Sequence, residues 1–207
     1  MRARFIALEG GEGAGKSTQG RLLADAVRAQ GHEVVTTREP GGTPGAEAIR
    51  ALLLANDAPD WGPRAEALLF AAARADHVAT LIRPALERGE WVICDRYLDS
   101  SRAYQGGGGG LSDADLLALH RIGSGGLVPD LTLLLTLDPA EAQARLALRD
   151  AGGADRIGGR DTAYHARVAQ AFLRFAAAEP ERFAVIDAAG SPGTVHGRIM
   201  AALATLA

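Results

Sequence analysis

Lysine is almost absent from this chain of 207 residues, although positive charge is not. Arginine supplies 21 of the 22 basic side chains, and the single lysine is Lys16. With 25 acidic residues the net charge is −3, which argues against the broad basic surface that nucleic acids and anionic membranes require. A few arginines can still converge on a smaller anionic ligand.

Cysteine and long apolar runs are also scarce. The single cysteine, Cys94, excludes an internal disulfide. No apolar run is long enough to span a membrane, and residues 1–4 lead into a strand-like segment without the features of a secretory signal. We therefore expect a cytoplasmic protein with neither membrane nor nucleic-acid partners.

Five short apolar runs predict the strands of one sheet. Hydrophobic residues make up 47% of the chain and charged residues 23%, which is ordinary for a globular protein with a core. Helical patterns separate the runs, so we predict an α/β fold with a five-stranded parallel sheet and helices on both faces. The predicted strands are Phe5–Glu9, Glu33–Thr37, Trp91–Asp95, Leu131–Leu137 and Phe183–Asp187.

Three helices are indicated by their end signals. Apolar spacing predicts a helix over Lys16–Gln30, which Gly31 ends. Pro63 can open a long helical segment that reaches Arg88, and Ser191 can cap the last helix. The glycine run at 106–110 is interpreted as a flexible loop.

The segment after the first strand matches the phosphate-binding pattern G-x-x-x-x-G-K-[ST] in full. Its glycines let backbone N–H groups face phosphate oxygens, its serine can bind Mg²⁺, and its lysine reaches the β- and γ-phosphates. A bare glycine turn that caps a helix is the alternative. The predicted ATP-binding residues are Gly10, Gly11, Glu12, Gly13, Ala14, Gly15, Lys16, Ser17 and Thr18.

The geometry of this loop explains why one lysine survives in an arginine-rich chain. Lysine carries a compact charge on a thin stem, whereas arginine carries a wide planar fork. A narrow loop around a phosphate has room for the first only. Lys16 is therefore predicted to be catalytic.

A phosphate loop alone does not separate a kinase from a nucleotide-dependent switch or a motor. Five segments occur here in order: EGGEGAGKST, TREPGGT, LLFAAARADHV, CDRYLDSSRAYQG and DRI. Together they resemble the bacterial thymidylate kinases. The resemblance implies one P-loop kinase domain over 1–207, ATP and dTMP as partners, Mg²⁺ as cofactor, transfer of a phosphoryl group to give dTDP for DNA replication, and a homodimer. The alternative functions are another pyrimidine nucleoside monophosphate kinase and a P-loop ATPase that acts as a switch.

Two residues follow the third strand, whose end should lie beside that of the first. Asp95 can hold Mg²⁺, and Arg96 can fork onto phosphate oxygens of donor and acceptor. Asp138 is a competing magnesium ligand, but it precedes a helix, where an acidic residue is an ordinary cap. The resemblance also favours Asp95.

Phe70 and Arg74 are four residues apart and therefore share one helix face. Phe70 can stack on a pyrimidine ring, and Arg74 can donate to the carbonyl edge of that ring. Ordinary core packing is the alternative for Phe70. The resemblance assigns both positions to thymine.

The remaining acceptor residues come from the resemblance. Ser101 and Gln105 belong to the block that closes on the nucleoside, and Tyr104 would pack against the sugar and exclude a 2′-hydroxyl. Arg38 would reach the acceptor phosphate. Glu9 would meet the 3′-hydroxyl or a metal-bound water.

Arginines and glycines alternate over residues 149–160, which we interpret as a short arginine-rich lid. An arginine delivered on closure would stabilise charge on the transferring phosphoryl group. Because the phosphate loop offers Glu12 rather than an arginine, this role falls to Arg156 first and Arg149 second. Gly158 departs from the acidic residue common after DRI in the family.

Overall fold

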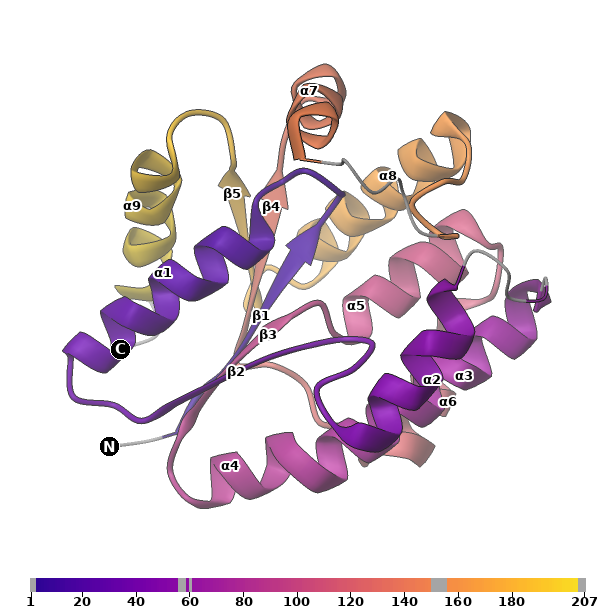
Figure 1. The fold of residues 1–207 in the computed structure, drawn as a ribbon, viewed down its shortest axis with the longest axis horizontal. Helices are drawn as coiled ribbons and strands as arrows, with labels where there is room; N and C mark the ends of the chain where they lie inside the picture. The colour runs from indigo at the N-terminus through magenta and orange to yellow at the C-terminus, as the bar shows by residue number, and fades with distance from the viewer. Residues whose placement is uncertain (1–2, 56–58, 60, 150–155, 205–207) are drawn as a thin grey trace.

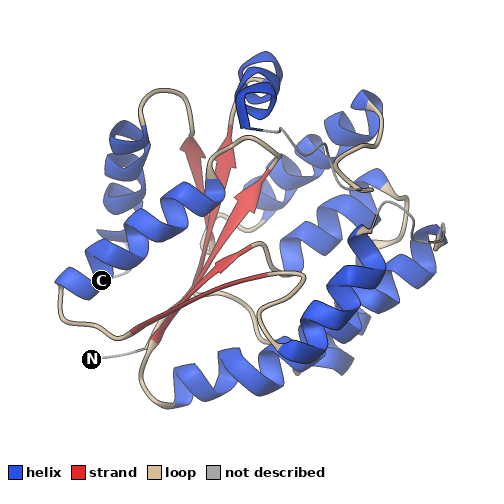
Figure 2. Ribbon diagram, viewed as in Figure 1, coloured by secondary structure: helices blue, strands red, loops and turns tan. Residues whose placement is uncertain are grey.

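The computed structural model describes residues 3–55, 59, 61–149 and 156–204. Its five strands form one parallel sheet in the order β2-β3-β1-β4-β5 (Figures 1 and 2). The predicted five-stranded parallel sheet is confirmed. The strands are β1 (Phe5–Gly10), β2 (Val34–Arg38), β3 (Trp91–Asp95), β4 (Leu131–Thr136) and β5 (Phe183–Asp187).

The central strand, β1, is buried along its whole length. On one side Leu8 pairs with Asp95 of β3, and on the other it pairs with Leu133 of β4. The carboxyl ends of β1 and β3 are therefore neighbours, as the sequence predicted. Ligands of open parallel sheets bind at this edge.

Helices cover both faces of the sheet (Figures 1 and 2). On one face α1 (Lys16–Ala29) packs beside α9 (Pro192–Leu203), whose first turn is capped by Ser191 as expected. Most of the other helices lie on the opposite side, and α7 lies beyond the end of β4. Their bounds are α2 (Pro44–Leu54), α3 (Gly62–His77), η1 (Val78–Ile82), α4 (Arg83–Glu87), α5 (Leu98–Ser101), η2 (Arg102–Gly108), α6 (Asp113–Ser124), α7 (Pro139–Arg149) and α8 (Thr162–Ala178).

The long helical segment predicted from Pro63 to Arg88 is present, but it contains an irregular turn. The chain runs from α3 through η1, a turn of π-helix, into α4 without leaving helical geometry. Pro63 lies in the first turn, where its missing N–H costs no hydrogen bond. None of the helices in the described part of the chain is long and apolar enough to cross a membrane.

The core is divided between the two faces of the sheet. Leu23 of α1 and Ile199 of α9 pack on one face against Leu133. On the other face a second cluster includes Phe5 and Tyr97, whose rings meet edge to face with centroids 4.8 Å apart. Burial of these side chains holds both layers on the sheet.

The glycine run at 106–110 is not the flexible loop that the sequence suggested. Residues 106–108 belong to η2, which packs tightly against α8. A Cβ atom on Gly107 would lie 2.4 Å from the Cβ of Ala171, and one on Gly108 would lie 2.5 Å from the ring of Tyr164. The glycines therefore permit close helix packing, and the loop prediction was wrong for these three positions.

Candidate active site

The phosphate loop joins the end of β1 to the start of α1. Gly10, Gly13 and Gly15 have φ values of 134°, 74° and 87°, which are unfavourable for other residues. A Cβ atom on Gly10 would also lie 2.3 Å from the carbonyl oxygen of Leu135. The helix that follows begins at Lys16 and directs its free N–H groups toward the loop.

Lys16 is folded onto its own loop. Its Nζ atom donates to the carbonyl oxygens of Gly11, at 2.7 Å, and Gly10, at 3.1 Å. Burial, followed by the nearby charge of Arg96, lowers the pKa of Lys16 to about 8. Carbonyl groups compensate a buried ammonium poorly, so a phosphate oxyanion is a better partner for it.

Ser17 and Asp95 lie side by side at the sheet edge. The Oγ atom of Ser17 donates to Oδ2 of Asp95 at 2.7 Å. Asp138 instead accepts from the backbone N–H of Ala140, at 2.9 Å, and therefore begins α7 as a cap. A hydroxyl and a carboxylate in contact are oxygen donors of the kind that Mg²⁺ prefers, so this pair fits the predicted metal site.

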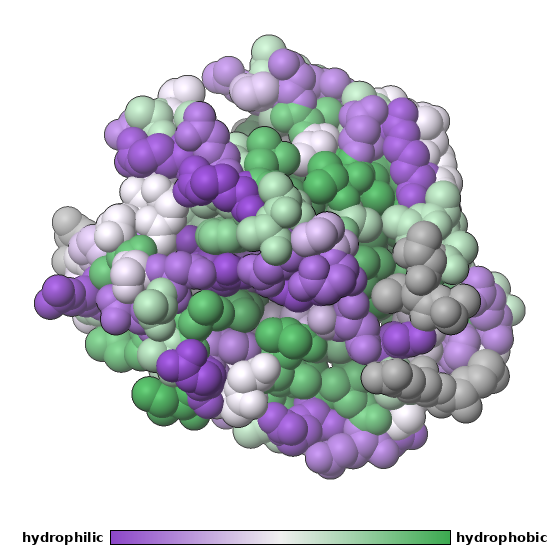
Figure 3. All heavy atoms as spheres, turned by 180° about the vertical axis from the view of Figure 1, so that it is seen from behind, coloured by the Kyte–Doolittle hydropathy of each residue, from purple (hydrophilic) through white to green (hydrophobic). Residues whose placement is uncertain are grey.

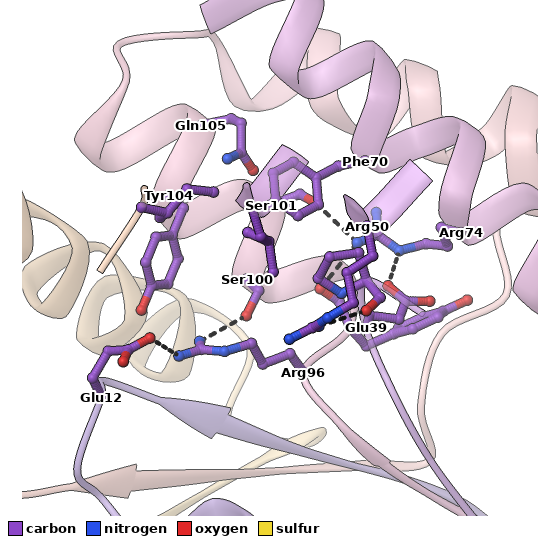
Figure 4. Close-up of a pocket in the computed structure, with 14 residues that line it drawn as sticks. Glu12, Glu39, Arg50, Phe70, Arg74, Arg96, Ser100, Ser101, Tyr104 and Gln105 are labelled. Carbon is purple, nitrogen blue, oxygen red and sulfur yellow. Dashed lines mark hydrogen bonds and ion pairs between the residues drawn. The ribbon is translucent and has the colours of Figure 1, made fainter. Parts of the chain in front are cut away.

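Arg96 lies between the phosphate loop and a neighbouring cavity. It has a φ of 68°, the one positive value among the non-glycine residues that the structure describes. Its Nη1 atom donates to the carbonyl oxygen of Gly10, at 3.1 Å, and to Oγ of Ser100, at 3.2 Å. The guanidinium stacks over the ring of Tyr104 and pairs with Glu12 at 3.5 Å (Figure 4). It can therefore contact ligands on both sides.

A cavity lies beside Arg96, with about 620 Å³ of empty space that includes the open solvent at its mouth. In Figure 4, Glu12 and Tyr104 lie toward one end and Arg74 toward the other. Six residues predicted to bind the acceptor line it. The lining consists of Glu12, Glu39, Pro40, Arg50, Leu54, Phe70, Arg74, Arg96, Tyr97, Ser100, Ser101, Tyr104, Gln105 and Ile157.

Arg74 is fixed at one end of the cavity by three bonds. Its Nε atom donates to Glu39 at 2.7 Å, and Nη2 donates to Oγ of Ser101 at 2.9 Å and to the carbonyl of Tyr97 at 3.1 Å. Burial would lower the pKa of this guanidinium, but Glu39 and its other neighbours raise it instead. Its Nη1 group has no hydrogen-bond partner among the described residues.

Tyr104 lines the same cavity with its ring. The ring is held edge to face by Tyr164 and Phe172, and the guanidinium of Arg96 lies over it at 5.0 Å from the centroid. Tyr104 is therefore held rigidly between these three side chains.

Glu66, which the sequence did not single out, lies behind the cavity lining and binds Gln105. Its carboxylate is buried and accepts from Gln105 at 2.8 Å, from Arg156 at 2.8 Å and from Arg160 at 2.6 Å. A glutamate within an apolar helical run was the signal that sequence reasoning passed over. Three donors compensate its buried charge.

Arg156, the first choice for the lid arginine, is one of these donors. Its side chain contacts Glu66 and, through Nε, the carbonyl oxygen of Leu53 at 3.0 Å. The structure therefore holds Arg156 against the acceptor cavity and not over the phosphate loop. The side chain of Arg149, the second choice, lies outside the described residues, as do residues 150–155 of the predicted lid.

Glu9 is not brought into the cavity. It is fully buried, and it accepts from the N–H groups of Tyr97 and Ser100, at 2.8 and 3.0 Å, and from the Ser100 hydroxyl at 2.6 Å. Burial, and then the charge of Asp99, raises the pKa of Glu9 to about 7. In this structure Glu9 supports the segment after β3 rather than facing the acceptor.

Arg38, which was predicted to reach the acceptor phosphate, does not line the cavity in this structure. It is exposed and pairs with Glu47 at 3.1 Å, outside the cavity. Arg50 of α2 lines the cavity instead, and its Nη1 atom donates to the carbonyl oxygen of Pro40 at 2.7 Å. The signal for Arg50 was a single arginine within the apolar run AIRALLL.

Comparison with known proteins agrees with this geometry. The family model described as "Thymidylate kinase" matches residues 8–199. A thymidylate kinase of Rhizorhabdus wittichii is 59% identical over 206 residues, covering 100% of this chain and 99% of the relative. A thymidylate kinase of Bradyrhizobium diazoefficiens is 50% identical over 204 residues, covering 98% of this chain and 89% of the relative.

A solved structure gives the same result. The crystal structure of thymidylate kinase from Ehrlichia chaffeensis superposes with a TM-score of 0.80 at 31% identity, covering 98% of this chain and 100% of that one. The chain belongs to the thymidylate kinase family and phosphorylates dTMP to dTDP, with ATP as the phosphoryl donor.

Proposed function

We propose that dTMP occupies the cavity with its base toward Arg74 and its phosphate toward Arg96, facing the γ-phosphate of ATP. The position of Arg96 carries this proposal. It contacts Gly10 of the phosphate loop and Ser100 of the cavity with one nitrogen atom. A bidentate cation at this boundary suits a reaction between two phosphates.

Thymine would stack on Phe70 and accept a hydrogen bond from Nη1 of Arg74. Support comes from the helix α3, which carries both side chains into the cavity (Figure 4). Ser101 and Gln105 would complete the base site. Tyr104 would lie against the sugar, where its fixed ring leaves little room for a 2′-hydroxyl.

The acceptor needs no general base. The second pKa of a phosphate monoester is about 6, so the attacking oxygen is largely ionised near neutral pH. Catalysis is then positioning and charge neutralisation. Arg96 and Arg50 would hold the acceptor phosphate, so that Arg38 would not need to reach it.

The donor phosphates would lie on the backbone of residues 10–18. On binding, the Lys16 ammonium would exchange the carbonyls of Gly10 and Gly11 for oxygens of the β- and γ-phosphates. Such an exchange replaces two neutral acceptors by anionic ones. It would also stabilise the charged form of Lys16, whose pKa burial lowers to about 8.

Ser17 and Asp95 would hold Mg²⁺, whose role when bound is to neutralise charge on the donor phosphate oxygens. The contact between these two side chains supports this assignment. Asp95 is anchored by its place at the end of β3, opposite Leu8.

A lid of residues 149–160 would stabilise the charge that develops on the transferring phosphoryl group. The lid would belong to a single kinase domain over residues 1–207. Because Arg156 is engaged by Glu66, Arg149 becomes the proposed lid arginine. Its test is a fall in kcat without a change in the KM for dTMP when Arg149 is replaced by alanine.

A homodimer is part of this proposal. Leu68 of α3 and Ile122 of α6 are 57% and 84% exposed, and these two helices pack side by side. Apolar side chains that remain exposed on adjacent helices are typical of an interface. The face seen in Figure 3 mixes hydrophobic and hydrophilic patches. Light scattering tests the interface, because Ile122→Asp should shift the protein from dimer to monomer.

The cytoplasmic location stays a prediction.

The acceptor assignment is tested by ADP release with Mg–ATP and dTMP, dUMP, dCMP, dGMP or no acceptor. We expect ADP release to depend strongly on dTMP. Among the pyrimidine monophosphates, dCMP should support less ADP release than dUMP. Turnover that prefers a purine monophosphate would remove the assignments of Phe70 and Arg74. ADP release that ignores every acceptor would contradict the whole acceptor site.

A further inference from the structure

A continuous line of side-chain contacts leads from the edge strand β2 to Arg74. Oγ1 of Thr37 lies 2.7 Å from Nε2 of His77, and Nδ1 of His77 lies 3.0 Å from Oε1 of Glu39. The other oxygen of Glu39 accepts from Nε of Arg74 at 2.7 Å. We call Thr37, His77, Glu39 and Arg74 the relay.

The relay is built into the interior. His77 is fully buried, and Glu39 and Arg74 are 5% and 4% exposed. A Cβ atom on Gly42 would lie 2.3 Å from Oγ1 of Thr37 and 2.7 Å from Nε2 of His77, so the loop backbone lies directly against the first bond. Water is thereby kept from competing for the two contacts of Glu39, whereas Thr37 is half-buried at its end of the relay.

One tautomer of a neutral His77 satisfies both of its contacts. With the proton on Nδ1, the ring donates to Glu39, and Nε2 accepts the hydroxyl proton of Thr37. Glu39 then has one oxygen committed to His77 and the other to Arg74. Its carboxylate plane is fixed, and with it the plane of the guanidinium that it binds.

We propose that His77 and Glu39 are positioning residues for base selection, acting through Arg74. This rests on the proposed function, in which Nη1 of Arg74 donates to the carbonyl edge of thymine. Arginine has donors only, so a correctly held guanidinium donates to a carbonyl oxygen and has no acceptor for the amino group that cytosine carries at the same place. The relay thereby converts a flexible side chain into a selective one.

A matched pair of substitutions at His77 tests the proposal. Leucine and asparagine have similar shapes, but only asparagine can place an N–H donor where Nδ1 stood. We expect His77→Leu to raise the KM for dTMP about tenfold and to lower the dTMP over dCMP preference by a similar factor, as for loss of other supporting contacts. His77→Asn should restore much of both, and the KM for ATP should change in neither.

The thermal midpoint of each variant separates positioning from folding. If His77→Leu fails to fold, Thr37→Val serves in its place, because it removes the far end of the relay with little change of shape. Thr37→Val should also raise the KM for dTMP and lower the dTMP over dCMP preference, but by smaller factors than those expected for His77→Leu. Equal dTMP and dCMP kinetics for His77→Leu and His77→Asn would overturn the proposal. So would a KM for ATP that rises as much as the KM for dTMP.

A spectroscopic measurement separates failure of this inference from failure of the proposed function. In nitrogen NMR of the ligand-free protein, His77 should show a proton on Nδ1, the atom that faces Glu39. A ring protonated at Nε2 alone would remove the donor to Glu39 and overturn the relay, whatever the acceptor proves to be. If the relay is present and dTMP is not the acceptor, only the assigned ligand falls.

Discussion

The two ends of the active site are held in different ways. At the base end, the polar side chains bind buried carboxylates, as in Arg74 with Glu39 and Gln105 with Glu66. At the phosphate end, Lys16 rests on two carbonyls of its own loop. The base end is preorganised, whereas the phosphate end is held by contacts that a ligand can replace.

This difference teaches where selectivity and catalysis reside. A fixed guanidinium discriminates between bases because it cannot adapt to the wrong one. A lysine with poor partners gains more from a phosphate, since it exchanges neutral acceptors for charged ones. Substitutions at the two ends should therefore change different kinetic constants.

The largest effect is expected for Lys16→Arg. The wide guanidinium fork does not fit the narrow loop, so kcat should fall about 10³-fold, as on loss of transition-state charge stabilisation. Steady-state assays of ADP release with saturating ATP and dTMP measure this fall in kcat. Arg21→Lys, an exposed position on the same helix, is the control and should leave kcat unchanged. Near-normal turnover of Lys16→Arg would show that charge alone suffices.

Asp95→Asn should come next, with a fall in kcat of about 10²-fold and a higher Mg²⁺ requirement, because a neutral amide is a weaker ligand. The amide can still accept from Ser17, so the fold should persist. Asp138→Asn, which keeps a capping side chain, is the matched control. The assignment is wrong if the Mg²⁺ titration shifts for Asp138→Asn and not for Asp95→Asn.

The third prediction separates the two lid arginines. Arg156→Ala should raise the KM for dTMP about tenfold with little change in kcat, because it removes one support of Glu66 and Gln105. Arg149→Ala should instead lower kcat and leave the KM for dTMP nearly unchanged. Steady-state kinetics over a range of dTMP concentrations distinguish them. A large fall in kcat for Arg156→Ala would return the charge-stabilising role to that residue.

The smallest effect on turnover is expected at Glu9, where stability rather than catalysis should change. Its folded pKa of about 7 lies above the unfolded value of 4.5. The protonated carboxyl therefore stabilises the fold fully below pH 4.5, and this contribution, up to about 3 kcal/mol, is lost as the pH rises through 7.

Urea unfolding at pH 5 and pH 8 measures this dependence. The free energy of unfolding of the unmodified chain should fall across the interval by more than that of Glu9→Gln, which cannot ionise. Glu87→Gln, at an exposed position, is the control. Equal pH dependence of the unmodified chain and Glu9→Gln would mean that the carboxylate is well accommodated by its three hydrogen bonds.

The sequence predicted the sheet and the phosphate loop because both depend on local patterns. The five strands begin and end within a residue of their expected bounds, with β2 extending through Arg38 and β4 ending before Leu137. The loop motif and the helix that starts at Lys16 were equally local. The resemblance to the family supplied Phe70, Arg74 and Tyr104, which the fold brings to one cavity.

Side-chain pairs between distant segments were beyond local reasoning. Glu39 meets Arg74 across 35 positions, and Glu66 meets Arg156 across 90. The lid arginines look alike in sequence, and only the structure shows that Arg156 and Arg160 both pair with Glu66 of α3. The glycines at 106–108 were read as flexible because glycine favours loops, whereas here their missing side chains permit close packing.

The most direct test of the contrast between the two ends is a crystal structure with dTMP and a non-hydrolysable ATP analogue bound. The account predicts that the Arg74–Glu39 and Glu39–His77 contacts remain as they are, while the Nζ atom of Lys16 leaves the carbonyls of Gly10 and Gly11 for phosphate oxygens. A Lys16 that stays on those carbonyls, or an Arg74 that abandons Glu39 to reach the base, would contradict it.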